Sequence, residues 1–347
     1  MKEESIESLG EFGVIDRIAS RARCLNKTSL VGIGDDCAVI ACDGSTRRKV
    51  VTTDLLLEGI HFDLTYCPLR HLGYKAVAVN LSDVAAMNVR PQQITVSIGV
   101  SAKFSLKSID ELYEGIYAAC ERYGVDLVGG DTTSSLTGLT ISITAIGDEE
   151  ADRLSLRSGA KENDILCVSG DLGSAYMGLQ LLEREKRVLK QSGSQTPDFG
   201  NYRYILQRQL RPEPRIDVVD FLREIDVVPT SMIDISDGLS SEVLHICKAS
   251  GVGCRLYEEK IPIHEEAKRL AGELNINPIV AALNGGEDYE LLFTIRQSDY
   301  EKFQSKVGPE IYAVGYITNA QKGTRLLTTG GDEAELKAQG WKMEVNV

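Results

Sequence analysis

The sequence predicts an α/β protein with two domains and mixed sheets. Its 347 residues exceed what one ordinary hydrophobic core holds. Short apolar runs alternate with amphipathic helical segments, which indicates layered α and β structure. Several strands follow one another without a helix between them, which favours mixed sheets over purely parallel ones. The polar segment 147–163 separates two such series, so we expect an N-terminal domain at 1–148 and a C-terminal domain at 149–347.

The first half contains one segment of outstanding apolar character. Residues 71–87 are apolar nearly all round, which predicts a buried helix, and Asn80, Asp83 and Met87 share one of its faces. Segment 139–146 alternates as a strand does, and Gly124 is a typical helix stop. In order, we expect a helix at 8–23, a hairpin tip at Arg47–Lys49, a strand at 50–53 ending in Asp54, a loop at 55–67, the helix at 71–87, a strand at 94–100, a helix at 108–123, a short strand and glycine turn at 127–131, and a strand at 139–146.

The second half repeats this alternation. Segment 191–200 is rich in Ser, Gly and Pro, which is typical of a mobile loop, and Gly251 is placed to cap a helix. In order, we expect a strand at 164–169, a helix at 173–189, the loop at 191–200, a helix at 216–225, a strand at 232–235, a helix at 239–249, a helix at 264–274, a strand at 289–295, a helix at 298–306 and a strand at 311–316.

Composition and charge exclude several classes of function. The chain has 51 acidic against 38 basic residues, a net charge of −13, and no basic run that would bind nucleic acid. A substrate that carries phosphate therefore needs metal ions as intermediaries. The eight cysteines show no zinc-site spacing and mostly lie in apolar surroundings, which is typical of a reducing compartment. Because no signal-peptide pattern and no apolar run of membrane-spanning length occurs, we expect a cytoplasmic protein without membrane contacts.

Acidic residues recur beside glycines or hydroxyl residues at the edge of apolar runs. Magnesium prefers oxygen ligands, and glycine lets backbone N–H groups approach phosphate oxygens. We therefore expect these acids to hold several divalent ions, and the ions to hold a nucleoside triphosphate. Any single one could instead be a helix N-cap, but a cap does not explain the mid-helix Asp83. The segments are Gly32–Asp36, Val51–Asp54, Leu81–Asp83, Gly129–Asp131, Ile233–Gly238 and Gly285–Asp288.

Other motifs are either absent or ambiguous. No GxxxxGK[ST] loop, protein-kinase signature, GxGxxG fingerprint or GxSxG elbow occurs. His61 is either an ordinary loop histidine or a ligand contact, and Arg157 is either a solvated charge or a phosphate clamp. Trp341 either packs on a core or offers its face to a flat ring.

Ten short motifs, in this order along about residues 10–318, together resemble thiamine-monophosphate kinases. The wider superfamily includes aminoimidazole ribonucleotide synthetase, selenophosphate synthetase and a hydrogenase maturation factor. One departure is Asn88, where the family pattern has glycine; asparagine tolerates a positive φ, so the turn should survive. The motifs are Gly10–Gly13, Gly32–Ala38, Thr53-Asp54, Gly59–Phe62, Tyr74–Ala76, Asn80–Met87, Gly129–Thr133, Arg157–Lys161, Asp234–Leu239 and Gly285–Leu291.

The resemblance implies roles for individual residues. The implied magnesium ligands are Asp36, Thr52, Thr53, Asp54, Asp83, Asp131, Asp234 and Asp237. The implied nucleotide contacts are Gly130, Asp131, Arg157 and Ser236. The implied contacts to thiamine phosphate are His61, Glu287 and Trp341. Among the acids, Asp54, Asp131 and Asp237 are expected to act in the transfer step itself.

The resemblance also implies an activity and an assembly. We expect magnesium-assisted, direct in-line transfer of phosphate from ATP to thiamine monophosphate, which yields thiamine diphosphate. The implied assembly is a homodimer in which N-terminal sheets pack into a barrel-like interface. Two alternatives stay open: another ATP-dependent superfamily member of the purine-pathway cyclo-ligase type, and a non-catalytic nucleotide-binding protein.

Overall fold

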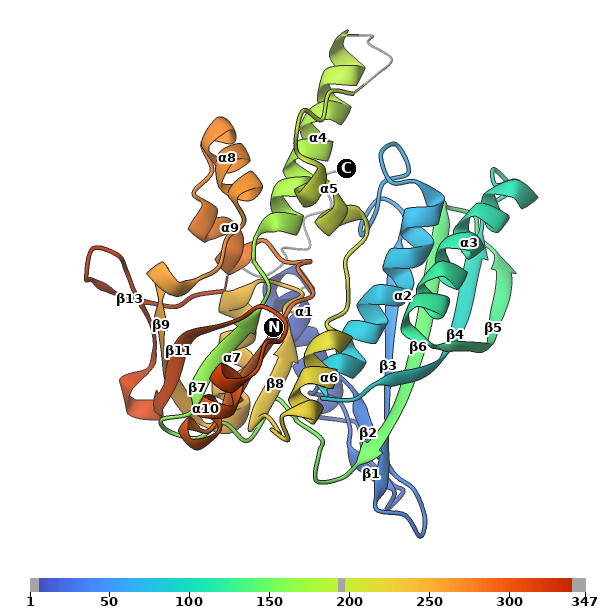
Figure 1. Cartoon of the computed structure of the whole chain (residues 1–347). Helices are drawn as coiled ribbons and strands as arrows, with labels where there is room; N and C mark the ends of the chain where they lie inside the picture. The colour runs from blue at the N-terminus through green and yellow to red at the C-terminus, as the bar shows by residue number, and fades with distance from the viewer. Residues whose placement is uncertain (1–5, 193–196, 339–347) are drawn as a thin grey trace, which may run out of the picture.

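The protein contains two mixed sheets with helices packed on them (Figure 1). The computed structural model describes residues 6–192 and 197–338. The first sheet has the order β1-β2-β3-β6-β4-β5, and all neighbours are antiparallel except the parallel pair β4–β5. Its strands are β1 (Ser29–Val31), β2 (Ala38–Ala41), β3 (Arg47–Leu57), β4 (Pro91–Val100), β5 (Asp126–Ser134) and β6 (Leu139–Glu150).

Helices α2 (Leu69–Ala86) and α3 (Leu106–Tyr123) cover one face of this sheet, here called the inner face (Figure 1). The two helices approach closely through glycines. A Cβ atom on Gly73 would lie 2.0 Å from the Leu112 carbonyl oxygen, and one on Gly115 would lie 1.9 Å from that of Arg70. No other residue fits at either position, so this close crossing of the two helices requires both glycines. The opposite face, here called the outer face, carries no helix of the described chain in Figure 1.

The second sheet has the order β13-β12-β9-β11-β7-β10-β8, in which only β12–β9 is parallel. Its strands are β7 (Ile165–Ser169), β8 (Ser231–Asp234), β9 (Val252–Tyr257), β10 (Leu291–Ile295), β11 (Ile311–Asn319), β12 (Thr324–Leu327) and β13 (Glu333–Glu335). The remaining helices are α1 (Ile6–Ala19), α4 (Ser174–Ser192), α5 (Arg203–Leu210), α6 (Ile216–Glu224), α7 (Leu239–Ser250), α8 (Glu265–Leu274), α9 (Pro278–Asn284) and α10 (Gln297–Ser305), with short 3₁₀ turns at Glu258–Lys260 and Ala320–Lys322.

The two halves share a hydrophobic core. Ile141 of the first sheet, Phe221 of α6 and Phe293 of β10 belong to one continuous cluster of buried side chains. Helix α6 lies beside α2 at the junction, so the inner face of the first sheet is sealed partly by the second half of the chain (Figure 1). The mixed-sheet α/β fold is as predicted, whereas the division at residue 148 stays a prediction; β6 itself continues to Glu150.

Three local predictions were wrong in an instructive way. Strand β3 spans Arg47–Leu57 and pairs with β6 along its whole length, so Asp54 lies within a strand and not at its end. Arg47–Lys49 is part of this strand and not a hairpin tip, and Arg47 binds Asp148 across the pair. Gly129–Gly130 is not a turn, because β5 continues through it beside β4. Sheet pairing extends all three segments beyond what their local composition indicates.

Several elements were not anticipated, and each is short. They are β1, β2, α5, β9, α9, β12 and β13. The predicted helix at 8–23 is α1, which ends at Ala19 and is broken at Gly10 with φ of 64°. Asn88 has φ of 59°, as expected for the turn after α2. No described helix has the length and apolar character needed to span a bilayer.

Candidate active site

Three carboxylates from distant parts of the chain meet at the junction of the two halves. Oxygen atoms of Asp36, Asp83 and Asp234 all lie within 4.8 Å of one another. Asp36 precedes β2, Asp83 belongs to α2, and Asp234 is the last residue of β8. Asp36 and Asp234 are buried, and Asp83 is half-buried. We call these three residues the acidic cluster.

Helix α2 builds the cluster by binding a strand on each side. The Thr52 hydroxyl donates to Asp83 Oδ2 at 2.7 Å, and the Asp54 N–H donates to Asn80 Oδ1 at 3.0 Å, so β3 is fixed on one side. The Ser82 hydroxyl donates to Asp234 Oδ2 at 2.6 Å, which attaches the end of β8. A helix with polar side chains at consecutive positions near its end can thus bridge the two sheets.

The acids of the cluster have too little positive charge near them to balance their own negative charge. Burial, and then the nearby Asp36 carboxylate, raises the pKa of Asp234 to about 8. Burial raises the pKa of Asp54 to about 6. Burial, followed by repulsion from Asp54 and Asp234, holds the pKa of Asp83 well above its ordinary value. The negative charges repel each other, so a divalent cation would be bound favourably here.

The donor set fits magnesium. It consists of carboxylate oxygens with a threonine hydroxyl beside them, which are the hard ligands that Mg²⁺ prefers. The buried Asp36 Oδ2 has no hydrogen-bond partner, so a ligating oxygen is free. The other oxygen, Oδ1, lies 2.6 Å from Arg157 Nη2.

A large open cavity lies on one side of the acidic cluster. Its volume is about 770 Å³, and its walls include Asp36, Asp83, Arg157, Ser236 and Asp237. Burial, and then Glu11, raises the pKa of Asp237 to about 6. We call this cavity the first cavity. Its guanidinium, its several acids and its wide opening suit a nucleoside triphosphate with its metal ions.

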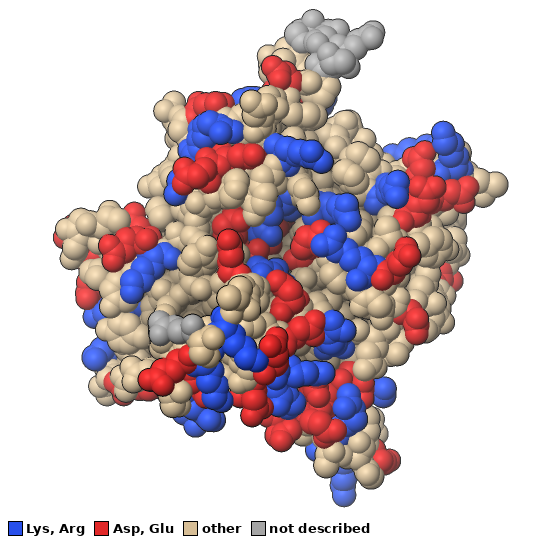
Figure 2. Space-filling view, in the orientation of Figure 1, with Lys and Arg blue, Asp and Glu red and all other residues tan. Residues whose placement is uncertain are grey.

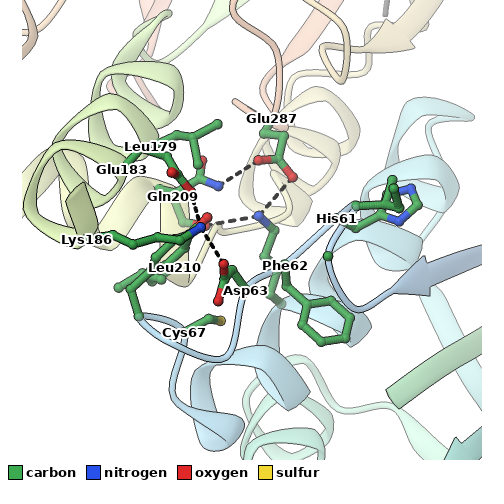
Figure 3. A pocket seen from close by; sticks show the side chains of 14 residues that line it. His61, Phe62, Asp63, Cys67, Leu179, Glu183, Lys186, Gln209, Leu210 and Glu287 are labelled. Carbon is green, nitrogen blue, oxygen red and sulfur yellow. Dashed lines mark hydrogen bonds and ion pairs between the residues drawn. The ribbon is translucent and has the colours of Figure 1, made fainter. Parts of the chain in front are cut away.

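On the other side, a small bridging cavity of about 170 Å³ leads to a distal cavity of about 220 Å³. Asp54 and Asp83 border both the first and the bridging cavity, and His61 and Glu287 border both the bridging and the distal cavity. Figure 3 shows the distal cavity, with Glu287, Gln209 and Lys186 around it and the His61 ring on the side away from Lys186. The three cavities therefore adjoin one another in a row past the acids.

His61 is arranged as a neutral hydrogen-bond donor. Its Nδ1 accepts the Leu57 N–H at 3.0 Å, which leaves Nε2 to carry the proton. Burial lowers its pKa below the ordinary value, so the ring is uncharged at neutral pH.

Within one chain, some predicted site residues lie away from the acidic cluster. Thr53 alternates with Thr52 and Asp54, so its hydroxyl is on the outer face, where it donates to the Ile143 carbonyl oxygen at 3.1 Å. Asp131 is in register with Ser97, Ser142 and Leu55, which places it on the outer face of β5, three strands from β3.

Gly130 packs so closely on β4 that a Cβ would lie 1.8 Å from the Val96 carbonyl oxygen, so sheet packing alone requires glycine there. Trp341 lies outside the described residues.

The structure also adds residues that the sequence did not assign to the site. Ser82 holds Asp234, and the Asp35 carboxylate accepts the Arg157 N–H at 3.2 Å. The buried Glu242 accepts the Asp237 N–H at 2.8 Å and so orients that loop. Ser82 and Asp35 lie inside quoted motifs, which is a signal that could have indicated them, whereas Glu242 carries none.

Comparison with known proteins identifies the family of this chain. The N-terminal domain of AIR synthase related proteins matches residues 34–148, and their C-terminal domain matches residues 161–327. A thiamine-monophosphate kinase of Bacillus subtilis (strain 168) is 35% identical over 338 residues, which cover 96% of this chain and 99% of that protein. The chain belongs to the thiamine-monophosphate kinase family.

Other members of the thiamine-monophosphate kinase family are similarly close. That of Escherichia coli (strain K12) is 36% identical over 294 residues, 82% of each chain. The solved structure of AaThiL complexed with AMPPCP and TMP has a TM-score of 0.83 and 32% identity, and the match covers 99% of this chain and 100% of that one. Hydrogenase maturation protein HypE in complex with ATP, at 18% identity and a TM-score of 0.69, shares the fold.

Proposed function

We propose that this protein transfers the terminal phosphate of ATP to thiamine monophosphate, which yields thiamine diphosphate and ADP. The observation that carries the proposal is the position of the acidic cluster between two cavities. The first cavity is large enough for a nucleotide, and the distal cavity can take the organic part of the acceptor. Relatives of this chain are named for this activity, and a solved structure similar to it is a complex with AMPPCP and TMP.

Asp36, Asp83 and Asp234, with Thr52 and Asp54, would hold magnesium ions. When bound, the ions neutralise phosphate charge between donor and acceptor. In this proposal Asp237, Ser236 and Arg157 face the nucleotide, and His61 and Glu287 orient the acceptor. Because the acceptor oxygen is already anionic at neutral pH, no general base is needed. The protein itself aligns the donor and acceptor phosphates and excludes water from them.

A coupled assay of ADP release tests the function. We expect ADP release with thiamine monophosphate and magnesium, and none with thiamine, which lacks the acceptor phosphate. Turnover of the amidine substrate of the cyclo-ligase reaction alone would favour that superfamily activity instead. Binding of ATP without turnover of any acceptor would favour a nucleotide-binding protein.

We further propose that transfer is direct and in-line, without a phosphoenzyme. The shared borders of the three cavities support this, because Asp54 and Asp83 lie where donor and acceptor phosphates would approach each other. Rapid quenching with ATP labelled in the terminal phosphate should find label in thiamine diphosphate only. A labelled protein that forms and decays at the rate of turnover would exclude direct transfer.

Replacing His61 by alanine should mainly weaken binding of the acceptor. Loss of its Nε2–H donor is expected to raise the KM for thiamine monophosphate about tenfold, while the KM for ATP changes little. Steady-state kinetics with each substrate varied in turn measures both values. An increase confined to the KM for ATP would contradict the assignment.

We also propose a cytoplasmic homodimer formed by the outer faces of two first sheets. The outer face exposes Leu55, Leu57 and Val128 by 52%, 36% and 59%. Asp131 lies on this face above a hollow of about 330 Å³, so its proposed role at the nucleotide would depend on a partner subunit. The eight cysteines are free thiols, which is in keeping with a reducing compartment.

Replacing Leu55 by glutamate should disrupt this dimer, because it would bury a charge in the proposed interface. Light scattering after gel filtration should show the mass of a dimer for the wild type and of a monomer for the variant. Leu106→Glu is a matched control, since Leu106 is 85% exposed at the start of α3, on the opposite side of the sheet. An unchanged mass for Leu55→Glu would exclude the outer face as the interface.

A further inference from the structure

A buried lysine holds the carboxylate that faces the acceptor. Lys75 of α2 is 3% exposed, and its Nζ lies 2.8 Å from Glu287 Oε1. The same ammonium donates to the Gln209 carbonyl oxygen at 3.1 Å. Gln209 Nε2 in turn donates to Glu287 Oε2 at 2.7 Å (Figure 3). Each carboxylate oxygen of Glu287 therefore has one donor from the protein and keeps a second acceptor position for a ligand.

The backbone around Glu287 is equally constrained. Glu287 has φ of 59° and Tyr289 has φ of 52°, a conformation that is costly for residues with a side chain. The Glu287 N–H donates to the Ser236 carbonyl oxygen at 2.7 Å, and the Tyr289 N–H donates to that of Ile235 at 2.9 Å. The strained loop is thus tied to the segment that follows Asp234, and it directs the Glu287 side chain toward Lys75.

Lys75 also lies at a defined distance from the acidic cluster. Lys75, Val79 and Asp83 follow one another at intervals of four residues, so they form one row along α2. Lys75 borders the distal cavity, Val79 the bridging cavity, and Asp83 both the bridging and first cavities. Eight residues of α-helix span about 12 Å. The row therefore sets a fixed length between the acidic cluster, where the phosphates would lie, and the distal cavity, which would hold the organic part of the acceptor.

The charge of the distal cavity complements a single cation. Three acids border it, Asp63, Glu183 and Glu287, against two lysines, Lys75 and Lys186. Lys186 is paired with Asp63 at 2.6 Å and with Glu183 at 3.3 Å, away from Glu287. The distal cavity therefore has one excess negative charge. Glu287 lies where this cavity adjoins the bridging cavity, on the side of the acidic cluster.

We propose that Lys75, with Gln209, is a positioning residue that holds Glu287 to recognise the cationic ring system of the phosphate-ester acceptor. The inference rests on the proposed function and extends it to the residues that select the acceptor. Lys75 contributes by orienting Glu287. Its own positive charge would repel a cationic ring, so positioning and plain electrostatics predict opposite effects when it is removed.

The test is Lys75→Met, with kinetics for each substrate varied in turn. Because Glu287 loses its oriented partner, we expect the KM for thiamine monophosphate to rise about 10- to 100-fold, with the KM for ATP within about twofold and kcat within about threefold. Lys75→Arg, which keeps a donor, should recover part of the loss. A KM for the acceptor that stays equal or falls would overturn the proposal.

Lys186→Met is the charge-matched comparison. It removes the same charge from the same cavity but leaves both donors of Glu287 in place. We expect its KM for the acceptor to be several-fold lower than that of Lys75→Met. Equal increases in the two variants would mean that loss of either lysine disturbs the cavity alike, without a specific role through Glu287, which would overturn the proposal.

A double-mutant cycle with Glu287→Gln separates positioning from a structural role. Lys75→Met alone leaves the half-buried Glu287 without its cation, whereas the double variant removes both charges and should fold even where the single variant does not. If Lys75 acts through Glu287, adding Lys75→Met to Glu287→Gln should not raise the KM further; a further rise of the same size would overturn the proposal. Absence of ADP release from the wild type with thiamine monophosphate would instead refute the proposed function.

Discussion

Replacing Asp83 by asparagine is expected to lower kcat about 100- to 1000-fold, by analogy with the loss of one electrostatic group in a preorganised site. Asp83 is the member of the acidic cluster that α2 supplies, and it borders both the first and the bridging cavity. Steady-state ADP release at saturating substrates and magnesium measures the effect. Asp110→Asn, which neutralises an exposed carboxylate on α3, should leave kcat unchanged. A loss of less than about fivefold would mean that Asp83 only supports the fold.

The same substitution should stabilise the protein without metal. Burial and repulsion by Asp54 and Asp234 oppose ionisation of Asp83, and the neutral amide removes that repulsion while it can still accept from Thr52. Thermal unfolding in EDTA should therefore give a higher Tm for Asp83→Asn than for the wild type. This opposition of stability and activity is typical of residues retained for function.

Removing magnesium should destabilise the protein more at high pH than at low pH. The folded pKa of Asp234 is raised to about 8 and that of Asp54 to about 6, from an ordinary value of 3.8. Protonation therefore stabilises the metal-free fold fully below about pH 4, and this contribution is lost as pH rises toward 8. Magnesium binds the ionised form, so its stabilising effect grows over the same range.

The measurement is the difference in Tm with magnesium and with EDTA, at pH 5.5 and pH 8. Potassium chloride at matched ionic strength controls for screening of charge. We expect the larger difference at pH 8. An equal or larger difference at pH 5.5 would mean that magnesium does not bind at these carboxylates.

Much of the site was predictable because its signals are local. Asp83 lies in the last turn of an apolar helix, far from its N-cap, where an acid is too costly to be incidental, and that helix is α2. The alternation of a strand also indicates that Thr52 and Asp54 can share a face only if Thr53 points the other way. The structure shows this arrangement, with the Thr53 hydroxyl on the outer face.

Other features were not predictable, because they depend on contacts between distant segments. Asp131 resembles the other acids in its local sequence, and only the strand order places it on the far side of the sheet. Lys75 lies in a quoted motif, but its importance follows from a loop at Glu287 and a helix at Gln209 that pack on it. Helix α5 is too short to be recognised from periodicity, although it supplies Gln209.

Helix α2 reaches all three cavities, whereas α4 and α5 border only the distal one among them. A substitution that shifts α2 must therefore disturb the acids and the acceptor end together, and natural selection would remove it. Substitutions on α4 and α5 reshape the acceptor end alone. Evolution toward a different acceptor, or a laboratory library designed for that purpose, should consequently accumulate its changes on these two helices while the residues of α2 remain as they are.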